Sequence, residues 1–151
     1  MRNIRRNALQ KTILELNSSS NLITVLKTHI KKGESTMPTI FVNMIEGISE
    51  EQKKNMIKRV TEVSAKSVGV PQERAKIILT ERSTDQMAVG GKLLSEGGSN
   101  TSLYPIVFMN TKVGKSDELL LGWKKDVAEA ISETCNVPVE NVAVYFIEHR
   151  L

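Results

Sequence analysis

The chain has 151 residues, of which 40% are hydrophobic and 25% are charged, as in ordinary globular proteins with a modest core. Its formal net charge of +4 is unevenly distributed. Residues 1–36 contain seven bases and two acids, whereas the remaining residues contain fourteen bases and fifteen acids. Because the main part of the chain is close to neutral, we do not expect it to bind nucleic acid through a basic face.

The single cysteine, Cys135, excludes an intramolecular disulfide and a cysteine metal cluster, and we expect a buried or half-buried thiol. His29 and His149 lie far apart in the sequence, without metal-ligand spacing. The sequence has no phosphate-binding loop, no secretory signal and no apolar run of transmembrane length. We therefore expect a cytoplasmic protein without metal or cofactor that does not bind membranes.

Residues 1–37 form a basic extension that we expect to be missing from the working protein. The codons of Lys32, Gly33 and Glu34 can spell a bacterial ribosome-binding sequence shortly before the Met37 codon, which favours translation from Met37. Two alternatives stay open: a cleaved targeting peptide, since the segment is basic and contains Ser18–Ser20, and a retained tail.

Residues 38–96 predict a strand, a helix and a second strand. Thr39–Ile45 is rich in β-branched and apolar residues, and Ser49 with Gln52 predicts a helix N-terminus with a capping box. Met56, Ile57, Val60 and Val63 form an apolar stripe at helical spacing, which ends before Gly69 and Pro71. Ala75–Glu81 is the second strand, and Gly90-Gly91 then predicts a turn.

Residues 97–104 form a linker rich in glycine and serine, and residues 105–151 repeat the first pattern. The repeat predicts a strand at Ile106–Val113 and a helix that begins at Ser116. Its inward side chains are Leu120, Trp123, Val127, Ala130 and Ile131, and a strand follows at Val142–Glu148.

A shift of 67 residues superposes the two segments without a gap. It pairs Pro38 with Pro105, Phe41 with Phe108, Asn43 with Asn110 and Glu81 with Glu148. One offset that holds over more than forty positions indicates a duplication. We expect an α+β fold in which two tandem β-α-β repeats form one four-stranded sheet with both helices on one face. The uncovered face then favours a homo-oligomer.

The stretch Pro38–Gly47, followed by Ser49–Lys53, resembles the opening of 4-oxalocrotonate tautomerase subunits in the tautomerase superfamily. Gly90-Gly91 resembles the hairpin of that family, so the resemblance covers the first repeat, and the second repeat resembles a degenerate subunit fused to it. The resemblance implies a tautomerase-like β-α-β fold, a catalytic N-terminal proline and a trimer of fused chains.

The family typically holds its substrate with two arginines and places an aromatic residue at the floor of the site. Here Ile48 follows Gly47 where arginine is common, and Lys115 holds the equivalent position in the second repeat. Lys76 replaces the other arginine, with Arg74 expected two residues earlier on the same strand face, and Met87 replaces the aromatic residue.

The resemblance thus implies Pro38 as the catalytic residue and Lys76, Lys115, Arg74 and Met87 as candidates for substrate binding. The alternatives are solvated surface positions for the two lysines, a surface or interface position for Arg74 and a packing role for Met87.

A free Pro38 amine has a fixed direction and titrates near neutral pH, which suits a general base, whereas an amide nitrogen is not basic. Pro105 lies inside the chain, so we expect one active site per chain.

We expect an isomerase, a keto–enol tautomerase, that acts on a small 2-oxo or enol carboxylic acid. Two further interpretations stay open. One is a hydratase or dehalogenase of a small unsaturated acid, with Pro38 as cation and general acid. The other is a non-catalytic oligomeric binding or scaffold protein.

Overall fold

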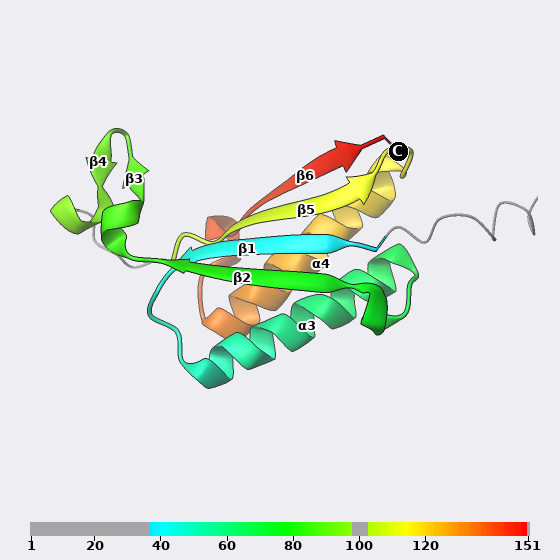
Figure 1. Ribbon diagram of the computed structural model, residues 1–151, viewed down its shortest axis with the longest axis horizontal. Coiled ribbons are helices and arrows are strands. Elements are labelled where there is room, and N and C mark those ends of the chain that lie inside the picture. Colours follow the sequence, from blue (N-terminus) through cyan, green and yellow to red (C-terminus); the bar gives the residue numbers. More distant parts are fainter. Residues whose placement is uncertain (1–36, 98–102, 151) are drawn as a thin grey trace, which may run out of the picture. The chain divides into compact units, whose positions relative to one another are not determined.

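The computed structural model describes residues 37–97 and 103–150. The predicted extension, except for Met37, and most of the predicted linker lie outside the described residues. Figure 1 shows the arrangement of the described elements, a mixed sheet with two helices against one of its faces.

The first repeat forms β1 (Thr39–Ile45), α3 (Glu50–Val68) and β2 (Lys76–Arg82). The predicted capping box is present at the start of α3, where Ser49 Oγ accepts from the Gln52 amide and Gln52 Oε1 accepts from the Ser49 amide. Gly69 ends the helix at a φ of 74°, a left-handed conformation that glycine adopts without strain. β1 matches its predicted bounds, and β2 begins and ends one residue later than predicted.

The second repeat forms β5 (Ile106–Lys112), α4 (Asp117–Cys135) and β6 (Ala143–His149). Ser116 is the N-cap of α4, as predicted, and its Oγ accepts from the Leu119 amide. Between the repeats, β3 (Ala88–Val89) and β4 (Lys92–Leu93) form the hairpin predicted at Gly90-Gly91.

The four long strands form one sheet in the order β2-β1-β5-β6. The strands within each repeat are parallel, whereas β1 and β5 pair antiparallel at the centre. The predicted α+β fold, two β-α-β units in one sheet, is therefore confirmed. Because β1 and β5 are equivalent strands, their antiparallel pairing relates the two repeats by an approximate two-fold axis.

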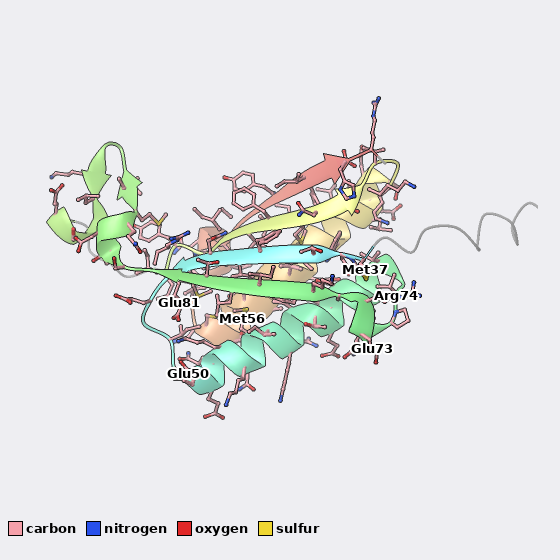
Figure 2. The ribbon with its side chains drawn as sticks, viewed as in Figure 1. Met37, Glu50, Met56, Glu73, Arg74 and Glu81 are labelled. Carbon is pink, nitrogen blue, oxygen red and sulfur yellow. The ribbon has the colours of Figure 1, made fainter. Side chains whose placement is uncertain are left out.

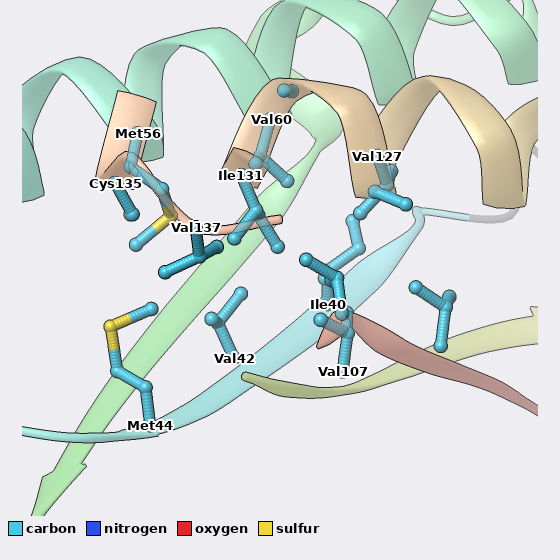
Figure 3. Packing of buried hydrophobic residues seen from close by; sticks show 14 of the residues in the cluster. Ile40, Val42, Met44, Met56, Val60, Val107, Val127, Ile131, Cys135 and Val137 are labelled. Carbon is cyan, nitrogen blue, oxygen red and sulfur yellow. The ribbon is translucent and has the colours of Figure 1, made fainter. Parts of the chain in front are cut away.

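The hydrophobic core lies between the sheet and the helices, and both repeats contribute to it. Figure 3 shows Ile40, Val42 and Met44 of β1 below Met56 and Val60 of α3 and below Val127 and Ile131 of α4. Cys135 is buried in the same cluster, as predicted, and burial raises the pKa of its thiol.

The other face of the sheet carries large apolar side chains that no described element covers. Strand pairing lines up Ile78, Phe41, Phe108 and Tyr145 in one row across the four strands. Ile78 is 45% exposed and Tyr145 is 54% exposed, and the rings of Phe108 and Tyr145 stack with centroids 5.8 Å apart. A row of this kind is a candidate contact surface.

Candidate active site

Pro38 directly precedes β1 and lies beside the first residue of β2. The Lys76 amide donates to the Pro38 carbonyl oxygen at 2.9 Å, which continues the parallel pairing by one residue. Pro38 is less than 2% exposed, whereas the side chain of Met37, directly before it, is 48% exposed. The proline is thus fixed at one end of the sheet, next to the residue that replaces a family arginine.

Lys115 belongs to the same end of the sheet although it comes from the other repeat. Thr39 pairs with Asn110, so the end of β5 lies beside the start of β1. The turn that contains Lys115 follows directly after β5 and leads into α4. We call Pro38, Lys76 and Lys115 the Pro38 end of the sheet.

The opposite end carries the equivalent positions, Pro105, Ala143 and Ile48, and we call it the Pro105 end. The Ala143 amide donates to the Pro105 carbonyl oxygen at 2.9 Å, the same bond that Lys76 makes to Pro38. Ile48 is only 9% exposed and packs into the core. All three positions at this end therefore lack the amine or cation that the family chemistry requires.

The antiparallel pairing decides at which end of the sheet Ile48 lies. The sequence showed only that Ile48 stands where the family often has an arginine and that Lys115 holds the equivalent position in the second repeat. In the structure Ile48 belongs to the Pro105 end, and the residue on the side of Pro38 is Lys115. The Pro38 end thus carries a lysine at each of the two positions.

Two of the candidate residues lie elsewhere than the sequence suggested. Arg74 ends a short 3-10 helix, Gln72–Arg74, and the strand begins only at Lys76, so the expected shared strand face is wrong. Figure 2 shows Arg74 and Met37 at one end of the described residues, away from Glu50 and Glu81. Arg74 thus lies near the Pro38 end but off the sheet.

Met87 follows the opposite end of β2, at the base of the hairpin. Seven strand residues separate it from the Pro38 end, a span of roughly 20 Å. Within one chain Met87 does not line a site at Pro38.

A cavity of about 160 Å³ lies at the Pro105 end, and Met87 is one of its lining residues. Arg82, Gln86, Asn43 and Tyr104 bring polar groups to it. This cavity could not be predicted from the sequence, because its residues come from three separate segments that only the fold brings together.

Two further features of the described residues bear on function. No helix in residues 37–97 or 103–150 combines the length and apolar character needed to cross a membrane. In the same ranges, no three histidine, cysteine, aspartate or glutamate side chains are grouped as a metal site would require.

Comparisons with known proteins agree with the fold and with the resemblance of the first repeat. A family model described as "Tautomerase enzyme" matches residues 38–97. A "Probable tautomerase" of Bacillus cereus is 42% identical over 60 residues, which cover 40% of this chain and 98% of the relative. A "2-hydroxymuconate tautomerase" of Bacillus subtilis is 38% identical over 60 residues, which cover 40% of this chain and 97% of the relative.

Solved structures share the fold over both repeats. A native fused 4-OT has a TM-score of 0.68 at 22% identity and covers 74% of this chain and 86% of its own. A fused 4-OT described as an asymmetric trimer has a TM-score of 0.65 at 20% identity, with 74% and 85% covered. A member of the cis-3-chloroacrylic acid dehalogenase family has a TM-score of 0.60 at 16% identity, with 74% of both chains covered.

The chain belongs to the tautomerase family, and its two repeats form the fold of the fused 4-OT proteins. Relatives named tautomerases support an enzyme of the tautomerase type.

Proposed function

We propose that this protein is a tautomerase whose general base is the amine of Pro38, released as the N-terminus of the working chain. Its substrate is a small enol or 2-oxo carboxylic acid of the 2-hydroxymuconate type, the activity for which the Bacillus subtilis relative is named. The observation that carries the proposal is that Lys76 and the turn that contains Lys115 lie at the same end of the sheet as Pro38.

The chemistry needs a base of moderate strength in a fixed direction. A terminal α-amine titrates at roughly pH 7.7–8.0, and nearby cations and burial lower this value toward neutrality. The proline ring fixes the direction of the amine relative to the strand. Pro38 takes the proton of the enol hydroxyl, the oxygen electrons form the carbonyl bond, and the double-bond electrons take a proton from the prolinium at the distal carbon.

Lys76 and Lys115 bind the carboxylate and stabilise the negative charge that develops on the oxygen during proton transfer. Lysine offers a point charge and lacks the two-pronged donor geometry of arginine. The substrate is therefore held less rigidly than two arginines would hold it.

The mechanism requires a break between Met37 and Pro38, because the nitrogen of an internal proline is an amide. Translation that starts at Met37, followed by hydrolytic removal of the methionine, meets this requirement. A chain that keeps residues 1–37 has no proline base and fits the non-catalytic binding or scaffold function.

The working protein is a homo-oligomer, and we propose a trimer. The uncovered apolar row of Ile78, Phe41, Phe108 and Tyr145 supports contact between copies, and fused 4-OT structures are described as trimers. Met87 lines a Pro38 site only if it comes from a neighbouring copy.

The test compares a chain that begins at Pro38 with its Pro38→Ala variant and with the full 151-residue chain, using 2-hydroxymuconate as substrate. The proposal predicts rapid ketonisation by the first protein and little by the other two. Equal rates for the first protein and its Pro38→Ala variant would exclude the proline mechanism.

A second candidate is dehalogenation or hydration of a small unsaturated acid, in which a protonated Pro38 acts as general acid. The shared fold with the cis-3-chloroacrylic acid dehalogenase family favours this candidate. Chloride release from 3-chloroacrylate, together with slow ketonisation of 2-hydroxymuconate, would select it over the tautomerase.

A further inference from the structure

The cavity at the Pro105 end has both polar and apolar walls. Arg82, the last residue of β2, brings a guanidinium group, and Gln86 and Asn43 bring side-chain amides. Met87 and Ile106 supply apolar lining, whereas the side chain of Met44 is 1% exposed and packs into the core. The Asn43 amide already donates to the Ile106 carbonyl oxygen at 3.5 Å, and the Gln86 amide oxygen accepts from the Ser83 amide at 3.2 Å. The wall therefore offers one cation and apolar surface to a molecule that enters.

Arg82 has no ion pair within residues 37–97 and 103–150, where every ion pair is formed by other side chains. The neighbouring carboxylate on the same strand, Glu81, binds Lys53 at 2.7 Å instead. The guanidinium thus keeps its donors available for a carboxylate from outside the chain, and its planar group can donate two parallel hydrogen bonds to that carboxylate.

Tyr104 forms part of the wall in a conformation that the neighbouring backbone fixes. Its φ of 45° lies in the left-handed region, which is unfavourable for a residue with a side chain. The Ile45 amide donates to the Leu103 carbonyl oxygen at 2.8 Å and so fixes the segment directly before Tyr104. Backbone strain that is held in place beside a cavity is typical of a binding site.

We propose that this cavity binds a small monocarboxylate, with its carboxylate on the Arg82 guanidinium and its short carbon chain against Met87 and Ile106. The volume of about 160 Å³ is well below the roughly 300–1,000 Å³ of pockets for drug-sized ligands, so it fits an acid of only a few carbons. A single cation suits one carboxylate better than a phosphate dianion.

The site binds without catalysing the reaction proposed for the other end. Pro105 is an internal proline without a basic nitrogen, and Ala143 and Ile48 hold the positions of Lys76 and Lys115. Binding at Arg82 is therefore independent of the proposed function of Pro38. The Pro105 end lacks the groups that the proposed reaction needs, but it keeps a ligand site that other residues line.

The experiment uses the full chain labelled with ¹³C at its methionine methyl groups and titrated with butanoate while NMR spectra are recorded. Met87 reports on the Arg82 cavity, Met37 reports on the Pro38 end, and Met56 and Met109 report on the intact core. Butyramide, which has the same shape without the charge, is the control ligand. So small a ligand binds weakly, with a dissociation constant in the millimolar range.

The proposal predicts a saturable shift of the Met87 signal with butanoate and none with butyramide. Arg82→Gln weakens binding about tenfold or more, as expected for the loss of a charge-assisted pair. Arg74→Gln, a matched loss of an arginine at the other end, leaves binding unchanged. Unchanged Met56 and Met109 signals show that each variant is folded.

Lys76→Gln tests whether butanoate binds instead at the Pro38 end of a neighbouring copy. The proposal predicts that this variant leaves the butanoate-dependent shift of Met87 unchanged. Gln86→Ala serves as a second variant and weakens binding severalfold. Absence of a saturable shift at Met87, a shift that survives Arg82→Gln, or a shift that Lys76→Gln abolishes would overturn the proposal. Saturable binding of inorganic phosphate in place of butanoate would overturn the ligand class.

Discussion

Phe41 and Phe108 face each other across β1 and β5, and they are also equivalent positions of the two repeats, 67 residues apart. A residue that pairs with its own equivalent marks the approximate two-fold axis of the sheet. Each end of the sheet therefore combines the first residues of one repeat with the turn that follows the first strand of the other repeat. This relationship places Lys115 with Pro38 and Ile48 with Pro105.

The two prolines should differ sharply in their effect on activity. In a chain that begins at Pro38, Pro38→Ala is expected to lower kcat/KM for an enol acid about 10²–10⁴-fold, the usual contribution of a general base. Pro105→Ala should leave kcat nearly unchanged, because the Pro105 nitrogen is an amide. Steady-state kinetics on 2-hydroxymuconate measures both, and a large loss of kcat in a folded Pro105→Ala variant would contradict the assignment.

The two lysines should act through substrate binding and charge stabilisation. We expect Lys76→Gln and Lys115→Gln each to lower kcat/KM by about tenfold or more, the cost of one charge-assisted contact. Lys76→Arg should lower KM, because arginine binds a carboxylate with two parallel hydrogen bonds. Lys58, an exposed lysine of α3, provides the matched control. Kinetics indistinguishable between Lys58→Gln and Lys115→Gln would remove Lys115 from the site.

The apolar row on the open face should be the contact between copies. Phe108→Asp places a charge at the centre of that row, where burial without a partner is costly. We expect light scattering to report a fall from the mass of the oligomer to that of one chain. Leu121→Asp, at an exposed position of α4, should keep the oligomer. A Phe108→Asp protein of unchanged mass would show that copies meet elsewhere.

The N-caps of the two long helices should stabilise the fold by similar amounts. Ser49→Ala and Ser116→Ala each remove a hydrogen bond from a serine hydroxyl to a helix amide. Each is expected to lower the free energy of unfolding by about 1 kcal/mol. Urea unfolding at one fixed protein concentration measures this, since association also changes apparent stability. No loss in either variant would show that water replaces these caps without cost.

Much of the fold was predictable because the sequence contains the pattern twice. Ser49 and Gln52 fixed the start of one helix, Ser116 fixed the start of the other, and β1 follows from its run of β-branched and apolar residues. The bounds of β2 and β6 were each one residue too early, since strand ends depend on pairing partners that the local sequence does not contain.

The site was only partly predictable, for a physical reason. Pro38, Lys76 and Lys115 stand at recognisable family positions, but their grouping depends on the antiparallel register of β1 and β5. That register brings together residues far apart in the sequence, so the sequence alone did not show at which end of the sheet Ile48 and Lys115 lie. Arg74 was misplaced on a strand because Pro71 and the 3-10 helix after it delay the start of β2.

The most direct test of the central claim is the intact mass of the protein isolated from cells that express it from its own gene with the native upstream sequence. We expect a mass that begins at Pro38, which means that the amine is free to act as the base. A mass that includes residues 1–37 would contradict it, because the nitrogen of Pro38 would then be an amide and the chain would lack its proposed catalytic group.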